Sequence, residues 1–262
     1  MNAPSRTKVV FEVIFAFFLI LMLLKAMQIP PFGEWKKQLF QRAYLEYVVM
    51  ISLPLILLFL TRRNFADYGI SFKNSGYHFK VVAICFLPIV TISAGLSFLN
   101  WKQWEGSLIL SLIEGGVLFA LFWLLRTQPS LHDLKAALLI PGVLLTTITI
   151  GSIGSAFVFF FLFNSLGEEI FFRGYIQSRL NEGFGRPFVV FGIKWGWGLI
   201  ITALMFSIMH VLNPFNPFLG KFDLAWPWGL WTFFLGLILG IVREKTDSIM
   251  APTILHGIIN FL

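Results

Sequence analysis

The sequence predicts an all-α protein, a polytopic bundle of about eight transmembrane helices, plus or minus one. Hydrophobic residues make up 57% of the chain and charged residues only 13%, whereas about a quarter of the residues of soluble domains are charged. The mean hydropathy is +0.81. A soluble domain of 262 residues could not hide this much apolar surface from water, so lipid is the expected solvent.

The predicted elements are apolar segments that could cross or enter the bilayer. They run approximately over residues 9–24, 43–60, 81–99, 107–125, 136–150, 153–180, 196–212, 228–242 and 249–262. Spanning needs about 20 helical residues, so the first segment is short. The fifth contains Pro141-Gly142 and is separated from the sixth by residues 151–154 only. We therefore expect a broken helix at 136–150, which reduces the predicted number of spans.

The chain shows no repeat, low-complexity tail or linker, which predicts a single integral membrane domain over residues 1–262. The basic start and apolar run 9–24 resemble a signal peptide, but no small-x-small cleavage site follows. The run is therefore expected to be a retained first span. Loop cations favour a cytoplasmic N-terminus. The expected location is the cell (inner) membrane, as a multi-pass protein.

Charge and cysteine content exclude several other classes. The net charge is +7, but Lys and Arg lie in short connections between apolar runs. This pattern indicates topology signals and contact with anionic headgroups, and no nucleic acid is expected as a partner. Cys85 is the only cysteine, so neither an intrachain disulfide nor a cysteine cluster for a metal can form.

The first candidate functional group is in the segment 153–180. Ionisable residues in a bilayer cost about 3 kcal/mol each on insertion scales, so they indicate function by default. Glu169 and Arg173 are four residues apart, in the order that favours an ion pair on a helix. Glu168 points about 100° away from Glu169. One carboxylate is therefore expected to be held by Arg173, while the other is free to meet another helix.

Two later segments carry the remaining polar groups. His210 follows Phe206 by four residues, and Asn260 follows His256 by four, so each pair shares a helix face. Glu168 and His210 both lie about 13 residues, roughly 20 Å along a helix, from the connection at 183–196. His256 lies roughly 12 Å from the connection at 243–248, on the same side. All three can reach one pocket that opens to the inner face.

Three motifs in this order resemble those of the CPBP family of intramembrane proteases, which includes CAAX prenyl endopeptidases and bacteriocin-processing or immunity proteins. The motifs are Glu168-Glu169-x-x-x-Arg173, Phe206-x-x-x-His210 and His256-x-x-x-Asn260. The resemblance covers roughly residues 150–262, the motif-bearing protease core. The N-terminal spans carry no matching motif.

The resemblance implies an endopeptidase, CAAX-protease-like, that hydrolyses a peptide bond with an activated water. Glu168 would be the general base, and His210 would help to position or protonate the reacting groups. His256 and Asn260 would donate hydrogen bonds to the tetrahedral oxyanion.

Glu169 and Arg173 would fix the helix and tune the local field. On its own, this pair is equally consistent with a purely structural ion pair. The implied partners are the lipid bilayer and a peptide or lipidated-peptide substrate that enters from the membrane. Whether that substrate is prenylated stays open.

Metal binding also stays open. Glu168, His210 and His256 could supply three zinc ligands and leave a fourth position for water. No His-Glu-x-x-His motif is present, however, and the same residues could activate water without a metal.

Other functions remain as alternatives. A non-catalytic bacteriocin-immunity or scaffold protein would not need the full residue set that is found here. A transporter would typically show corresponding broken helices in two halves, whereas the polar residues lie in one half. A lipid-modifying enzyme is also compatible with a pocket for amphiphilic substrates.

Overall fold

The computed structural model describes residues 4–40, 42–71, 73–97 and 156–261, and these residues are mostly helical, as predicted. One departure is a small antiparallel hairpin in the stretch expected as a connection, formed by β1 (Phe188–Val190) and β2 (Ile193–Trp195). The elements before residue 98 are α1 (Arg6–Ala26), α2 (Phe32–Phe40), α3 (Tyr44–Leu60), η1 (Phe65–Tyr68) and α4 (Ser75–Ser97). Those after the hairpin are α10 (Trp197–Val211), η5 (Pro217–Leu219), α11 (Trp226–Thr246) and α12 (Met250–Phe261).

The polar motif Glu168-Glu169-x-x-x-Arg173 lies in a continuous helical run that we call the motif helix. It consists of η3 (Val158–Ser165), α8 (Leu166–Glu169), η4 (Ile170–Gln177) and α9 (Ser178–Phe184). Both η3 and η4 are π-helical. Hydrogen bonds from i to i+5 widen the helix, and such segments are often found at functional sites. Here they flank the one α-helical turn that carries the two carboxylates.

Two helices in the described part of the chain, α1 and α11, are long and apolar enough to cross a membrane. The pair α2 and α3, bent by 105°, would make a third span, and α10 and α12 are shorter apolar helices. The predicted membrane character is therefore supported, whereas the count of about eight spans is not confirmed. The predicted segments 107–125 and 136–150, and with them the expected broken helix, lie outside the described residues.

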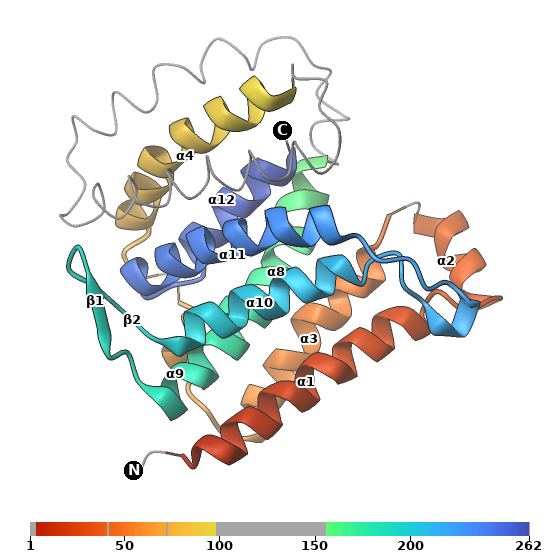
Figure 1. The fold of residues 1–262 in the computed structure, drawn as a ribbon, viewed down its shortest axis with the longest axis horizontal. Coiled ribbons are helices and arrows are strands. Elements are labelled where there is room, and N and C mark those ends of the chain that lie inside the picture. Colours follow the sequence, from red (N-terminus) through yellow and green to blue (C-terminus); the bar gives the residue numbers. More distant parts are fainter. Residues whose placement is uncertain (1–3, 41, 72, 98–155, 262) are drawn as a thin grey trace.

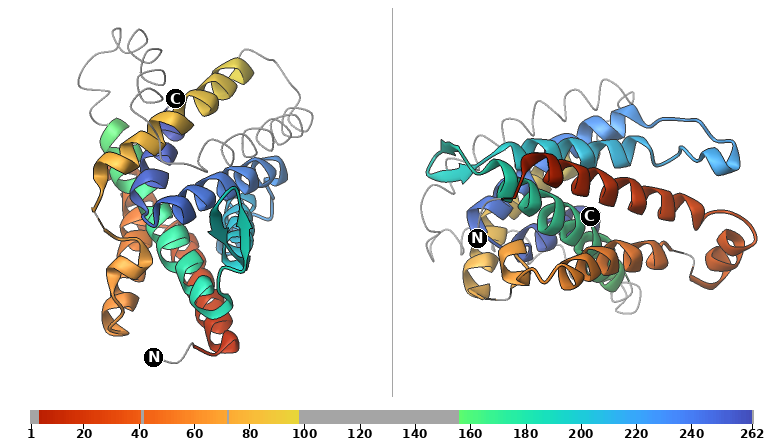
Figure 2. Two further views of the ribbon diagram at one scale, coloured as in Figure 1. Left: turned by 90° about the vertical axis from the view of Figure 1, so that its left-hand side faces the viewer. Right: turned by 90° about the horizontal axis from the view of Figure 1, so that it is seen from below.

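The helices gather around the motif helix (Figure 1). Its C-terminal half contacts α10, and α10 runs beside α11, where both face the hydrophobic core. Gly236 permits this close approach, since a Cβ there would lie 3.2 Å from Cα of Ala203. α1 and α3 contact the motif helix from the other direction, as the right-hand view of Figure 2 shows. α12 packs against α4 and the start of the motif helix.

A partly buried ionic cluster joins the N-terminal helix to the motif helix. Glu12 of α1 accepts hydrogen bonds from the guanidinium groups of Arg63 and Arg179 and from the hydroxyl of Tyr175. The hydrogen bond to Glu12 raises the pKa of Arg63, which lies beyond the end of α3. Both carboxylate oxygens of Glu12 are thus paired, and the cluster holds α1 and α3 against the motif helix.

Candidate active site

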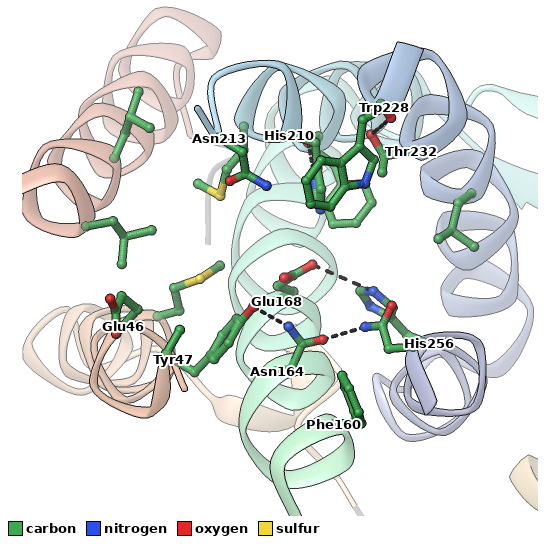
Figure 3. Close-up of a pocket in the computed structure, with 18 of the residues that line it drawn as sticks. Glu46, Tyr47, Phe160, Asn164, Glu168, His210, Asn213, Trp228, Thr232 and His256 are labelled. Carbon is green, nitrogen blue, oxygen red and sulfur yellow. Dashed lines mark hydrogen bonds and ion pairs between the residues drawn. The ribbon is translucent and has the colours of Figure 1, made fainter. Parts of the chain in front are cut away.

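A cavity of about 390 Å³ lies between the motif helix and α1, α3, α10, α11 and α12. Four of the six predicted site residues line it, from three different helices (Figure 3). These four are Glu168, His210, His256 and Asn260. The sequence motifs of the C-terminal half therefore converge on one chamber, while α1 and α3 supply part of its wall.

The two neighbouring carboxylates face different surroundings. Glu168 lines the cavity. Glu169 is fully buried behind it, where its Oε1 accepts a hydrogen bond from Nη1 of Arg173 at 2.9 Å. This geometry agrees with the prediction from helical spacing that one carboxylate is held by the arginine and the other is free.

Arg173 ties the motif helix to two further helices. Its guanidinium group is fully buried and donates through Nη2 to the carbonyl of Gly236 in α11 at 3.2 Å. It also lies 4.4 Å from the centre of the Phe206 ring in α10, a cation–π distance. Phe206 itself is fully buried and packs against the ring of His210. Phe206 and His210, which their spacing placed on one helix face, are therefore in contact.

His256 lies between the two carboxylates. Its Nδ1 is 2.8 Å from Oε1 of Glu169, and its Nε2 is 3.7 Å from Oε2 of Glu168. Because Glu169 already pairs with Arg173, its oxygen acts as the acceptor, and Nδ1 of His256 carries the proton. The contact of His256 with the carboxylates depends on close packing of α12 against the motif helix. Gly257 permits this packing, since a Cβ there would lie only 2.4 Å from Cδ1 of Phe161.

His210 is held by its own helix. Its Nδ1 lies 2.8 Å from the carbonyl oxygen of Phe206. A carbonyl can only accept, so Nδ1 donates and Nε2 is left as an acceptor in the neutral ring. The ring is flanked by Phe206 at 4.5 Å and Trp228 at 5.4 Å between ring centres. This packing fixes the orientation of an imidazole on the cavity wall.

Asn260 belongs to a hydrogen-bonded chain that the sequence did not predict. Its Nδ2 donates to Oδ1 of Asn164, and Asn164 in turn donates to the hydroxyl of Tyr47 in α3. Nδ2 also reaches Oγ of Ser165 at 3.4 Å. Asn164 precedes Glu168 by four residues, the spacing of neighbours on one helix face, so an amide in a phenylalanine-rich run was the available signal. Nothing local in the sequence pointed to Tyr47.

Lys25, at the end of α1, closes another side of the cavity. Its buried Nζ donates to the main-chain carbonyls of Leu212 at 2.7 Å and Asn213 at 2.9 Å. These carbonyls follow the end of α10, where helix carbonyls lack partners within the helix. Lys25 therefore joins the end of α1 to the end of the helix that carries His210.

The proposed zinc ligands have suitable donor atoms but are not assembled as a ligand set. In both His210 and His256, Nδ1 is engaged by an oxygen, an arrangement that orients metal-binding imidazoles in other sites. Among the described residues, however, no group of three or more His, Cys, Asp or Glu side chains is placed so that it could hold a metal ion. The arrangement in this conformation does not fit zinc, so no chemical step is derived through a metal.

Comparison with known proteins identifies the region that carries these residues. Residues 150–262 match the model of the Rce1-like family, described as type II CAAX prenyl endopeptidase Rce1-like. No curated protein and no solved structure matches the chain. The match spans all three motifs and confirms the resemblance that they predicted. The C-terminal part of the chain, residues 150–262, is thus similar to the Rce1-like family of type II CAAX prenyl endopeptidases.

Proposed function

We propose that the protein is an intramembrane endopeptidase that hydrolyses a peptide bond with a water molecule activated by Glu168 and His210. The observation that carries the proposal is the convergence of Glu168, His210 and His256 on one cavity among apolar helices. The similarity of residues 150–262 to the Rce1-like family supports peptide hydrolysis and a membrane context. The expected substrate is a peptide or lipidated peptide that enters from the membrane.

In the proposed reaction, Glu168 removes a proton from water while the water oxygen attacks the scissile carbonyl carbon. The Nε2 atom of His210, an acceptor in the neutral ring, positions the same water. The carbonyl π bond breaks to give an oxyanion, and the proton held by Glu168 then passes to the amine as the C–N bond breaks. General acid–base catalysis of this kind contributes about 10²–10⁴-fold to a rate.

His256 is proposed to stabilise the oxyanion together with Asn260. Its Nδ1 proton is fixed by Glu169. If Nε2 were unprotonated and Glu168 ionised, two acceptors would face each other at 3.7 Å. When Nε2 also carries a proton, His256 donates it as a hydrogen bond to the oxyanion that develops beside Glu168.

The role of Asn260 depends on the direction of its hydrogen-bonded chain. A tyrosine hydroxyl can donate as well as accept, so the chain Tyr47–Asn164–Asn260 can run either way. When Tyr47 donates to the carbonyl oxygen of Asn164, the amide of Asn164 donates to Asn260. The amide hydrogens of Asn260 are then free to donate to the oxyanion. We assign Asn164 and Tyr47 as positioning residues for Asn260.

The test is cleavage of a quenched-fluorescent peptide that ends in Cys-aliphatic-aliphatic-X, offered farnesylated and unmodified, in proteoliposomes. The wild-type protein should cleave at least one form. Glu168→Ala and His210→Ala should each lower the rate by about 100-fold or more, while an EDTA arm with each protein reports metal dependence. Unchanged cleavage by both variants would remove the catalytic assignment. Lys194→Gln, on the distant hairpin, is the matched control and should cleave like the wild type.

A further inference from the structure

A second pocket adjoins the candidate active site and has a different electrostatic character. It has a volume of about 380 Å³ and is lined by four cations and two acids. The cations are Lys36, Lys37, Arg42 and Lys221, and the acids are Glu34 and Glu46. Gln28, Ala43 and Glu46 line both this pocket and the cavity that holds Glu168, so the two are contiguous. We call the second one the basic pocket.

The positive charge of the basic pocket is only partly neutralised. Lys36 is buried and forms an ion pair with Glu46. Lys37 and Lys221 are exposed, and neither has an ion-pair partner in the part of the chain that the structure describes. The guanidinium of Arg42 rests on the Phe159 ring at 4.9 Å. The pocket thus presents an excess of cations to an incoming group.

The surroundings of the basic pocket are typical of the edge of a bilayer. α2 is bent by 105° from α3, so it runs across the direction of α3 rather than along it. Three exposed apolar side chains recur along one face of α2 at i, i+3 and i+7: Phe32, Trp35 and Leu39. A helix with an apolar face and lysines beside it is typical of one that lies in the membrane interface.

The segment between α10 and α11 adds to the same end of the molecule. In Figure 1 and in the right-hand view of Figure 2, this segment and α2 lie together, opposite the β1–β2 hairpin. It contributes Lys221 to the basic pocket, and Phe218, Phe222 and Trp226 nearby are about half exposed or more. Aromatic side chains are enriched at headgroup level. The cationic side chains and the exposed aromatic side chains therefore lie at the same end of the molecule.

We propose that the basic pocket binds the phosphate of an anionic phospholipid headgroup, with the acyl chains lying against Phe32, Trp35 and Leu39. The phosphate meets Lys37 and Lys221, whose charges are unpaired, and each lysine near an anionic surface contributes to binding. A bound lipid of this kind would sit at the mouth of the candidate active site. The exposed apolar stripe on α2 favours a lipid over a soluble anion.

The test is native mass spectrometry of the purified full chain with phosphatidylglycerol or phosphatidylcholine added. The wild type should bind the anionic lipid more tightly than the zwitterionic one. Lys37→Gln/Lys221→Gln should weaken phosphatidylglycerol binding about tenfold or more. Lys194→Gln removes one exposed cation from the hairpin at the other end of the molecule and should change binding less than about twofold. Equal binding of both lipids, or unchanged binding by the double variant, would overturn the proposal.

Two further arms separate the lipid from other anions and from catalysis. Inorganic phosphate at millimolar concentration should leave the lipid bound, and complete displacement would show a site for free phosphate instead. In vesicles without anionic lipid, the double variant should keep the wild-type KM for a cleaved peptide, and a raised KM would assign the pocket to a peptide carboxylate. Glu168→Ala should bind phosphatidylglycerol like the wild type, so failure of the proposed protease activity leaves this result intact.

Discussion

Glu168 and Glu169 are neighbours in sequence, yet the two faces of the motif helix that carry them are built differently. On the buried face, one oxygen of Glu169 accepts from Arg173 at 2.9 Å and contacts His256 at 2.8 Å. On the cavity face, Oε2 of Glu168 lies 3.7 Å from Nε2 of His256. Oε2 of each glutamate is buried without a hydrogen-bond partner among the described residues, so the two differ in the arginine that holds Oε1 of Glu169 and in the cavity beside Glu168.

This difference indicates which charge supports the fold and which is available for chemistry. Glu12, in the ionic cluster of α1, resembles Glu169 in being paired with arginine, although both oxygens of Glu12 are bound and only Oε1 of Glu169 is. Buried charges normally occur in such pairs. Glu168 departs from this pattern and lines a cavity. A carboxylate that lines a cavity and has no arginine or lysine partner among the described residues calls for an explanation, and reaction with a substrate provides one.

The largest expected effect is a difference in the free energy of unfolding between variants on the two faces of the motif helix. Arg173→Gln leaves Glu169 buried without its cation, so the free energy of unfolding should fall by about 3–5 kcal/mol. Glu168→Gln removes no ordinary hydrogen bond, and its free energy of unfolding should stay within about 1 kcal/mol of the wild type. Thermal unfolding in detergent, followed by tryptophan fluorescence, measures both.

A compensating variant sharpens this comparison. Glu169→Gln/Arg173→Met removes both charges and keeps an amide oxygen for Nδ1 of His256, so it should regain much of the stability lost in Arg173→Gln. Equal destabilisation by Glu168→Gln and Arg173→Gln would show that the two faces do not differ in the way proposed.

A smaller effect is expected along the chain that ends at Asn260. Asn164→Asp provides only acceptors, so it holds the amide hydrogens of Asn260 and withholds them from the oxyanion. The expected loss in kcat is about tenfold, equivalent to one hydrogen bond, with KM little changed. Tyr47→Phe should lower kcat less, because Asn164 can still turn its amide toward Asn260. Steady-state kinetics of both variants check this order. A higher kcat for Asn164→Asp than for Tyr47→Phe would contradict it.

The sequence predicted the helices of the C-terminal half to within a few residues. The helix that carries Glu168 was expected over residues 153–180 and ends at Phe184, and the segment expected from residue 196 begins as a helix at Trp197. Such helix ends are marked in the sequence by the length of the apolar run and by the glycine- or proline-rich stretch that interrupts it. The β1–β2 hairpin was not expected, because a glycine- and proline-rich connection does not reveal the pairing of two strands of three residues each.

The site was predictable where its residues form spaced motifs, and not where a single residue comes from a distant helix. Glu168, His210 and His256 each belong to a short motif in which two residues are four positions apart. Tyr47 and Lys25 belong to none, and they reach the cavity only because α3 and α1 pack beside the motif helix. Such contacts depend on tertiary packing, which local patterns do not encode. The number of spans and the catalytic roles stay predictions.

The central claim is that the cavity face of the motif helix is reached by water and the neighbouring face is not. Cys85 is the only cysteine and is fully buried, so single cysteines can be placed in a Cys85→Ala background. Glu168→Cys should react with a charged, water-soluble thiosulfonate reagent in the folded protein, whereas Glu169→Cys should not. Ser165→Cys, isosteric and fully buried on the same helix, should also stay unmodified. Unreactive Glu168→Cys, or equal labelling at all three positions, would contradict the claim.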